Sequence, residues 1–291
     1  MVAPGMSIPS ALAPLPAGYA DLYRRLYHVA DADERIRAMW LSGSLARGDA
    51  DAGSDLDVLL AVRDDDFDAF VESWRDWLAT ITPTLVARAL PFAPGAFYST
   101  TTDCLRLDVV TERVSGLAET PHRSRLVVLD RDGLDAAVPA REPGRGPDTE
   151  QMARLVEEFF RQQAIFPAAV VARGDWLCGC VGVQQAQQML YDVFVQANQP
   201  LPPMGIKRWS AKLTPEQRAV LESLPAPSPN KPASVITAMR ATALAWRYVG
   251  RQALAAAGVP WPEELDRTVG AYFDREVPSF LEATSAPDAR P

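Results

Sequence analysis

Two carboxylates at the start of an apolar strand are the feature that most limits how this chain folds. Asp55 and Asp57 stand two residues apart, and the run 56–62 is otherwise apolar. Since strand side chains alternate between two faces, both carboxylates point to one face and the apolar residues around them to the core. Ionised carboxylates about 6–7 Å apart repel each other, so folding alone gains nothing from the pair. A divalent cation that prefers oxygen ligands, such as Mg²⁺, converts this repulsion into attraction.

A third carboxylate stands in a similar setting further along the chain. Asp108 lies between Leu107 and Val109, and alternation places it on the same side of its strand as Arg106. If this strand neighbours the strand 56–62, Asp108 joins the first two carboxylates. Three carboxylates can hold two metal ions, which stabilise both the attacking and the leaving oxygen of a phosphoryl displacement.

A glycine–serine pair follows the expected strand 36–41. Gly43 lets the backbone approach a phosphate closely, Ser44 adds a hydroxyl, and backbone N–H groups at the start of the following helix or turn point at an anion. A Gly-Ser pair alone is usually only a turn, and an Asp-x-Asp pair is often a cap with an exposed neighbour. The ordered combination of Gly-Ser, ten residues, the pair at 55 and 57 and the distant Asp108 is a specific pattern.

The periodicity of apolar residues changes near residue 147. Before this point, strand-like runs accompany two amphipathic helices, one beginning at Tyr19 and one ending at Ile81. The expected strands are 36–41, 56–62, 84–90, 97–101, 104–111 and 125–130, with a hairpin around 102–103. After it, helical patterns dominate, and the longest are 176–197, 234–257 and 263–280.

The chain of 291 residues is therefore expected to have two domains. We predict a disordered tail over residues 1–16, a mixed-sheet domain over 17–143 and an α-helical bundle domain over 148–285. The Pro- and Gly-rich segment 139–147 is the expected linker. The predicted fold class is α+β.

The net charge of −8 is unevenly distributed. Residues 1–148 hold 23 acidic and 15 basic side chains, whereas acids and bases balance in residues 149–291. Such an acidic half attracts cationic ligands and argues against nucleic acid as a partner. No apolar run approaches the roughly 18 residues of a membrane span. Three cysteines without a secretory signal predict free thiols and a cytoplasmic location.

The motif GSLARG at 43–48, followed by SDLD at 54–57, resembles the signature of the polymerase-β-like nucleotidyltransferase superfamily. The form is especially similar to small bacterial members, among them the nucleotidyltransferases of aminoglycoside and lincosamide antibiotics. The resemblance covers residues 35–135, and it implies a nucleotidyltransferase domain with the superfamily's mixed sheet. A helical bundle after the catalytic domain is similar to the antibiotic-modifying branch.

The resemblance implies a role for each matched residue. Asp55, Asp57 and Asp108 would bind Mg²⁺ and carry the catalysis, with Asp108 holding the catalytic ion. Gly43 and Ser44 would contact the β- and γ-phosphates of a nucleoside triphosphate. ATP is the donor expected from the family as a whole.

The sequence leaves open the roles of two basic residues and the identity of the general base. Arg47 would contact phosphate or lie solvated in its loop, and Lys207 would reach the triphosphate from the helical domain or lie in a surface loop. Some aminoglycoside-modifying members carry a glutamate base in the strand before the third aspartate, but the segment 84–90 has no acid. The base would then be Asp108, or a carboxylate from elsewhere.

Each of several residues in the helical half has two alternative roles. The bundle offers the carboxylates of Glu157 and Glu158 as bases, and solvated helix acids are the alternative. The aromatic side chains of Trp176, Tyr191 and Trp209 would line an acceptor cleft or pack in the core.

These features predict an EC 2.7.7-type nucleotidyltransferase that transfers a nucleotide, by family base rate AMP from ATP, to a hydroxyl of a small acceptor and releases pyrophosphate. The acidic first half favours a cationic acceptor of the aminoglycoside type, and hence antibiotic resistance. One alternative is nucleotidylation of a protein or tRNA, as in toxin–antitoxin systems. Another is a catalytically silent regulatory module that binds nucleotide, against which the complete acidic triad argues. The sequence leaves the oligomeric state open.

Overall fold

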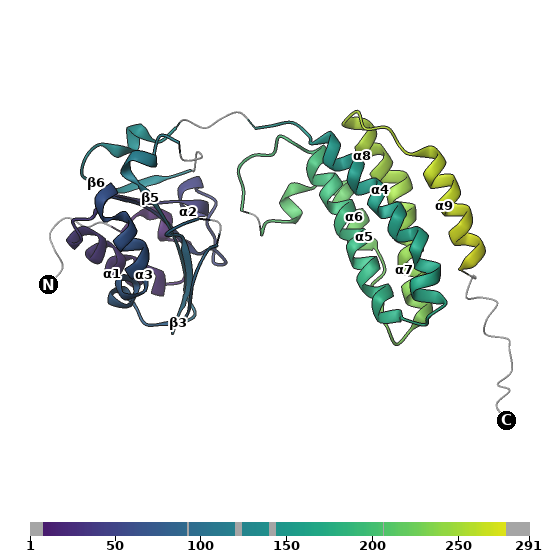
Figure 1. The fold of residues 1–291 in the computed structure, drawn as a ribbon, viewed down its shortest axis with the longest axis horizontal. Helices are drawn as coiled ribbons and strands as arrows, with labels where there is room; N and C mark the ends of the chain where they lie inside the picture. Colours follow the sequence, from purple (N-terminus) through teal and green to yellow (C-terminus); the bar gives the residue numbers. More distant parts are fainter. Residues whose placement is uncertain (1–7, 92, 120–123, 140–143, 206, 278–291) are drawn as a thin grey trace, which may run out of the picture. The chain divides into compact units, whose positions relative to one another are not determined.

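The computed structural model describes residues 8–91, 93–119, 124–139, 144–205 and 207–277 (Figure 1). Contacts divide the chain into two compact units. The first comprises Met1–Pro143 and Pro203–Ile206, and the second comprises Gly144–Pro202 and Lys207–Pro291. The division after Pro143 falls within the Pro- and Gly-rich segment 139–147.

The first unit is built on a mixed sheet with the strand order β3-β4-β5-β2-β1-β6. The strands are β1 (Ile36–Leu41), β2 (Leu56–Val62), β3 (Thr84–Ala89), β4 (Phe97–Thr101), β5 (Arg106–Arg113) and β6 (Leu126–Asp130). All neighbours pair antiparallel except β2 and β5, which are parallel. The helices are α1 (Gly18–Ala32), the short α2 (Gly43–Arg47) and α3 (Phe67–Ile81). The expected hairpin of β4 and β5 is confirmed.

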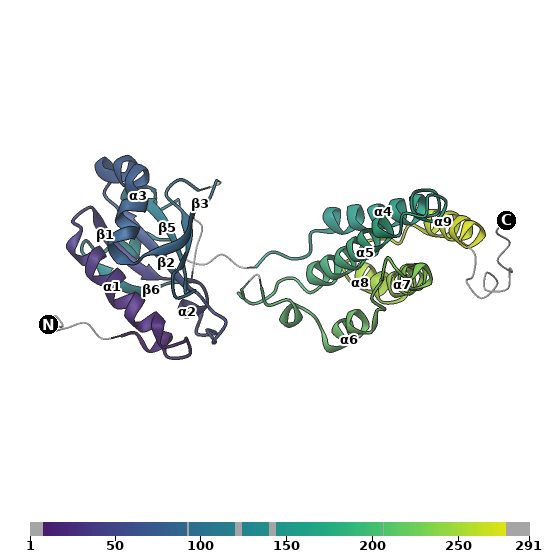
Figure 2. The same cartoon turned by 90° about the horizontal axis from the view of Figure 1, so that it is seen from below.

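Helices α1 and α3 cover one face of this sheet (Figure 2). Leu22 of α1 and Phe70 of α3 are fully buried in one cluster with Leu56, Val58 and Leu60 of β2, as the alternation predicts. A smaller cluster of side chains covers the opposite face beside β1 and β2. That cluster contains Ala38, Trp40, Leu59, Ala61, Leu117 and Val138. The odd-numbered residues of β2, including Asp57, belong to this second face.

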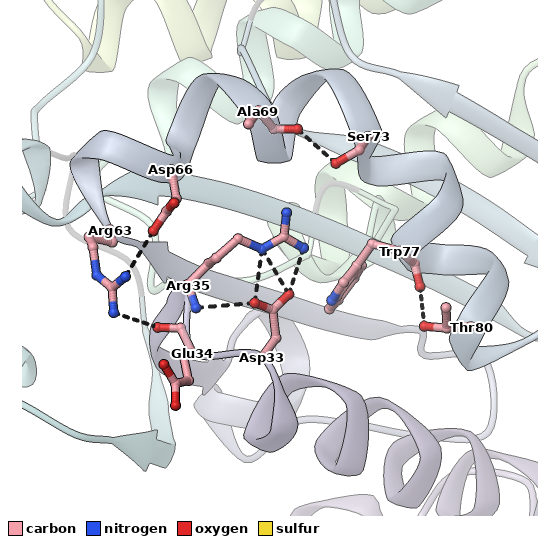
Figure 3. A network of polar contacts seen from close by, with 9 residues as sticks. All are labelled: Asp33, Glu34, Arg35, Arg63, Asp66, Ala69, Ser73, Trp77 and Thr80. Carbon is pink, nitrogen blue, oxygen red and sulfur yellow. Dashed lines mark hydrogen bonds and ion pairs between the residues drawn. The ribbon is translucent and has the colours of Figure 1, made fainter.

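A polar network joins the start of β1 to the start of α3 (Figure 3). The Arg35 guanidinium donates to the Asp33 carboxylate at 2.7 Å, and its charge lies over the Phe70 ring. Arg63 pairs with Asp66 at 3.1 Å and also donates to the carbonyl of Glu34. Because β1 and β2 are antiparallel, this end of the sheet is the one away from Asp57. The network therefore holds the fold together at a distance from the predicted site.

Residues 8–16 correct the prediction of a disordered tail over 1–16. Ser10–Leu12 forms a 3-10 helix, and Leu12 and Leu15 are buried in the same cluster as α1 and α3. Burial of the two leucine side chains stabilises this segment by about 1.5–3 kcal/mol for each side chain. The Ala- and Pro-rich composition of the segment does not reveal this contribution. Residues 1–7 lie outside the described residues.

The second unit consists of helices, as predicted for the C-terminal domain. They are α4 (Thr149–Phe166), α5 (Trp176–Ala197), α6 (Pro215–Ser223), α7 (Pro232–Ala245), α8 (Arg251–Ala256) and α9 (Glu263–Glu276). Its core centres on Phe159 of α4, whose ring stacks on that of Trp246 at 4.8 Å between centroids. Together with the first unit, these helices confirm an α+β fold with a helical C-terminal part. No helix in the described segments is both long and apolar enough to cross a bilayer.

The helical unit differs from the sequence prediction in two places. Helix α6 was not predicted, although Thr214 and Gln217 form a reciprocal capping box around Pro215 at the first helical turn. The expected single helix 234–257 is interrupted by a π-helical segment at Trp246–Gly250. There the indole N–H of Trp246 donates to the carbonyl of Ala186 on α5. The last three residues of the expected helix 263–280 lie outside the described residues.

Deletion of residues 1–16 is expected to destabilise the first unit, whereas deletion of residues 1–7 removes neither buried leucine. Loss of Leu12 and Leu15 should lower the free energy of unfolding by roughly 3 kcal/mol or more. Urea denaturation followed by tryptophan fluorescence measures the difference, because Trp74 and Trp77 share this cluster. Equal stability of the two shortened chains would show that residues 8–16 contribute nothing to the core.

Candidate active site

The two strands that carry the predicted carboxylates are neighbours. Strands β2 and β5 run parallel, with Leu56 opposite Leu107 and Asp57 opposite Asp108. Residues directly opposite each other in a sheet point to the same face, and neighbouring strands are about 4.8 Å apart. Since Leu56 and Leu107 both belong to the buried cluster under α1 and α3, Asp57 and Asp108 share the other face. The condition set by the sequence, that the two strands be adjacent, is met.

Asp55, the first residue of the predicted triad, is held by an arginine. Its carboxylate lies 3.3 Å from the guanidinium of Arg106, and Arg106 also donates to the carbonyl of Gly53. The parallel register extends naturally to this pair, because Asp55 precedes Asp57 by two residues and Arg106 precedes Asp108 by two. The sequence placed Arg106 on the carboxylate face but did not identify this ion pair.

Within the described residues, no three His, Cys, Asp or Glu side chains are grouped so that they could hold an ion. The carboxylate of Asp55, one of the three expected ligands, is paired with the Arg106 guanidinium. The structure therefore brings Asp57 and Asp108 together and places Asp55 beside them in an ion pair.

Gly43 and Ser44 lie directly against Asp57. Gly43 has a positive φ of 58°, and a Cβ atom at this position would lie 1.8 Å from the Asp57 carboxylate. Only glycine therefore fits between the end of β1 and this carboxylate. The backbone N–H of Ser42 donates to the carbonyl of Asp57 at 2.9 Å and fixes the loop on β2. The Ser44 hydroxyl is buried without a hydrogen-bond partner, which is unusual for a polar atom in a folded protein.

The two predicted basic residues lie in different units. The guanidinium of Arg47, at the end of α2, lies 3.2 Å from the carboxylate of Asp49. Lys207 belongs to the second unit and is exposed in a turn. Arg47 is thus on the same short helix as Gly43 and Ser44, and a role for Lys207 remains a prediction.

The two glutamates considered as general bases lie on the outer side of α4. Glu157 is exposed, and Glu158 accepts two hydrogen bonds of 2.6 Å from Arg161. The hydrogen bonds from the Arg161 guanidinium hold the pKa of Glu158 below its usual range. A carboxylate with a lowered pKa is a weaker base, which argues against Glu158 in this role.

The aromatic residues of the helical unit separate into two places. The rings of Tyr191 and Trp209 stack at 4.4 Å between centroids and line a cavity of about 290 Å³ with Gln184, Gln187 and Gln188. Trp176 packs at the start of α5 against a different cluster. Tyr191 is buried and Trp209 is half exposed, so Trp209 presents a free surface while Tyr191 supports it.

The six-stranded mixed sheet and the facing pair of carboxylates beside Gly43 and Ser44 define a nucleotidyltransferase of the polymerase-β-like type. The family model for streptomycin adenylyltransferase matches residues 18–171, which is more than half of the chain. The chain belongs to the streptomycin adenylyltransferase family, and so to an antibiotic-modifying family of nucleotidyltransferases.

The solved structures that match this chain are distant from it in sequence. An aminoglycoside 6-adenyltransferase from Bacillus subtilis is 14% identical, with 89% of this chain and 97% of that chain covered at a TM-score of 0.41. An apo CCA-adding enzyme is 11% identical over 96% and 75%, with a TM-score of 0.39. The cyclic dinucleotide synthase CdnE of Elizabethkingia meningoseptica is 9% identical over 92% and 97%, with a TM-score of 0.25. No curated protein sequence matches this chain.

Substitution of Gly43 tests the close contact with Asp57, and Gly48 at the other end of α2 is the matched control. Both glycines have positive φ, but a Cβ at Gly48 would meet open space. Gly48→Ala should therefore lower the free energy of unfolding only by the strain of a left-handed backbone, about 1–2 kcal/mol. Gly43→Ala should introduce the same strain and also displace the Asp57 carboxylate, with a fall in nucleotide transfer of about 100-fold. Equal behaviour of the two variants in stability and transfer would contradict the geometry.

Asp192 provides a pH-dependent test of the helical unit. Burial raises the pKa of its carboxyl above the usual value, while the hydrogen bond from Gln188 opposes the shift. Because the pKa is higher in the folded state, the protonated carboxyl of Asp192 contributes to the stability of the fold. This contribution is fully present below pH 3.8, the ordinary pKa, and is lost as the pH rises through the pKa of the folded state. At pH 7 the ionised side chain costs stability, so Asp192→Asn should raise the melting temperature there and lose its advantage near pH 4. A lower melting temperature at pH 7 would contradict this assignment.

Proposed function

We propose that this protein transfers AMP from ATP to a hydroxyl of a small acceptor of the aminoglycoside type and releases pyrophosphate. The observation that carries the proposal is the facing pair Asp57 and Asp108, with the Gly43–Ser44 loop pressed against Asp57. This arrangement puts acidic side chains next to a loop with an unsatisfied buried hydroxyl. Its chemistry is that of a site for a polyphosphate and its counter-ion.

The loop at Gly43 and Ser44 supports binding of the β- and γ-phosphates. The buried Ser44 hydroxyl has no partner within the described residues, and a phosphate oxygen would accept its hydrogen bond. Arg47 lies in the same loop, and its positive charge would add to the attraction for the leaving pyrophosphate. The donor side of the site is thus the side of β2 that borders β1.

The acidic residues fit Mg²⁺, which the family resemblance implies. Hard carboxylate oxygens on one sheet face are the donors that Mg²⁺ prefers. Asp57 and Asp108 would hold the ion, and Asp55 would become a ligand in exchange for Arg106. When bound, Mg²⁺ would supply positive charge to neutralise the triphosphate.

The transfer step needs a base for the acceptor hydroxyl. The hydroxyl oxygen forms a bond to the α-phosphorus, the bond from this phosphorus to the pyrophosphate oxygen breaks, and the hydroxyl proton passes to a base. Asp108 is the carboxylate on the face next to Asp57 that is suited to this role. Glu158 is less suited because Arg161 lowers its pKa.

The aminoglycoside-type acceptor is supported by two facts. The family is named for the adenylylation of streptomycin, and the excess of acidic side chains lies in residues 1–148. A negative surface attracts a polycationic acceptor, and the attraction weakens as salt shortens the Debye length to about 8–10 Å. Transfer in the cytoplasm, where ATP and Mg²⁺ are available, would make the activity one of antibiotic resistance.

The test is pyrophosphate release from each of four nucleoside triphosphates with a panel of aminoglycosides and lincosamides. We expect release with ATP and an aminoglycoside, and a fall of about 1,000-fold in Asp57→Asn, because several kcal/mol of charge stabilisation are lost. MgATP should also raise the melting temperature of the wild type more than that of Asp57→Asn. The variant Asp76→Asn, an exposed acid on α3, serves as the control and should behave as the wild type.

Three outcomes would redirect the proposal. Wild-type turnover in Asp57→Asn would remove the carboxylate pair from the site. Turnover only with tRNA or a protein would replace the antibiotic by a macromolecular acceptor. MgATP binding without turnover on any acceptor would leave a regulatory module that binds nucleotide.

A further inference from the structure

A groove between α1 and α3 lies at the end of the sheet away from Asp57. Its volume is about 750 Å³, within the range of about 300–1,000 Å³ that is usual for small-molecule pockets. Helix α1, the turn at residues 33–35 and helix α3 all line it. Strand β1 separates this groove from the loop at Gly43, because the strand begins after the turn and ends before the loop. The groove is therefore distinct from the carboxylate pair.

Trp77 brings an unsatisfied hydrogen-bond donor to this groove. Its side chain is 5% exposed, and its indole N–H has no hydrogen-bond partner within the described residues. Figure 3 shows the ring reaching from α3 toward the Asp33 carboxylate, which accepts instead from Arg35. Buried donors without a partner are rare in folded proteins, because each costs about 1–3 kcal/mol. An acceptor atom of a ligand in the groove would satisfy this donor.

Two hydroxyl groups of α3 line the same groove as acceptors. The Ser73 hydroxyl donates to the carbonyl of Ala69 at 2.7 Å, and the Thr80 hydroxyl donates to the carbonyl of Trp77 at 2.6 Å (Figure 3). Each hydroxyl has one hydrogen, which is used within the helix, so its oxygen can only accept from a ligand. A ligand that fits the groove must therefore carry several N–H or O–H donors as well as an acceptor.

The net charge of the groove is negative. Its lining includes the carboxylates of Asp33, Glu34 and Asp76 and the guanidinium of Arg35. Arg35 donates to both oxygens of Asp33, at 2.9 and 2.7 Å, so these two charges largely cancel. Even a protonated His28 on α1 would leave the lining with more negative than positive groups. Such a groove attracts a cation and disfavours phosphates and carboxylic acids.

We propose that this groove binds an amino sugar, that is, a hydroxylated ring that carries at least one ammonium group. A ring or hydroxyl oxygen accepts from the indole N–H of Trp77, and ring hydroxyls donate to Ser73 and Thr80. The excess of carboxylates holds the ammonium group. Val29 and Ala32 of α1 also line the groove and offer apolar surface to the C–H groups of the ring. This site is independent of the proposed nucleotide transfer.

The indole N–H resonances of the nitrogen-15-labelled whole chain report on the site directly. The chain has seven tryptophans, and Trp77→Phe identifies the Trp77 signal by its loss. Glucosamine should move this signal downfield, because a hydrogen bond forms where the structure has none. The signal of Trp40 should stay in place, since its indole N–H already donates to Asp135 at 2.8 Å.

Three further probes test the class of ligand. Glucose has the hydroxyl groups without the charge, and cyclohexylamine has the charge without an oxygen. Each should bind about tenfold more weakly than glucosamine, as expected for the loss of one charge-assisted or buried hydrogen bond. Neamine, an aminoglycoside of two rings, distinguishes the source of the ligand. Tighter binding of neamine than of glucosamine assigns the groove to aminoglycosides, and the reverse assigns it to free amino sugars.

Two pairs of variants locate the bound ligand, with affinity measured by isothermal titration calorimetry. Trp77→Phe keeps an apolar ring but removes the donor, and it should weaken glucosamine binding about tenfold. Trp74→Phe, a change of another buried tryptophan of α3 that does not line the groove, is its control. Glu34→Gln should weaken binding by about two- to fivefold, whereas Glu72→Gln, at an exposed acid outside the groove, should not.

Three results would overturn the proposal. If neither glucosamine nor neamine moves the Trp77 signal of the wild type, the groove is not an amino-sugar site and water satisfies the indole N–H. If glucose or cyclohexylamine binds as tightly as glucosamine, the class of ligand is wrong. If binding persists in Trp77→Phe and moves the Trp209 signal, the ligand lies in the helical unit.

Discussion

The parallel pairing of β2 with β5 is the constraint on which the first unit depends. It sets Asp57 opposite Asp108 and Leu56 opposite Leu107, so one register fixes both the buried and the acidic face. Two ionised carboxylates at one strand spacing repel by about 3 kcal/mol at an effective dielectric constant near 20. The core under α1 and α3 must outweigh this cost, because a slip of one residue would exchange the two faces.

The rest of the site follows from the position of this pair. The loop after β1 must pass the Asp57 carboxylate so closely that only Gly43 fits, and Ser44 is then buried with an unsatisfied hydroxyl. Arg106, one alternation before Asp108, meets Asp55 and balances its charge. The same alternation brings Tyr98 and Arg88 onto the face beyond Asp108. One sheet register thus places these side chains on a common face.

Local patterns allowed much of the fold to be predicted, whereas non-local contacts did not. The bounds of β1, β2, β4 and α5 agree with the apolar periodicity, because alternation and helical spacing are local properties. The sequence required β2 and β5 to be adjacent for Asp108 to join the other carboxylates, but it could not show that they are. Strand order depends on contacts between residues far apart in sequence. The burial of Leu12 and Leu15 depends equally on such contacts and was missed. Helix α6 was missed although Thr214 and Gln217 gave a local signal. The ion pair of Asp55 and Arg106 could be predicted only from the pairing register of β2 and β5.

The central claim is that the carboxylate pair and the Gly43–Ser44 loop together bind a metal–nucleotide complex. The most direct measurement is the anomalous scattering of Mn²⁺ in crystals grown with a non-hydrolysable ATP analogue. The account predicts manganese between Asp57 and Asp108, with phosphate oxygens accepting from the Ser44 hydroxyl and Asp55 released from Arg106. Manganese and phosphates bound elsewhere, with the Asp55–Arg106 pair intact, would contradict it.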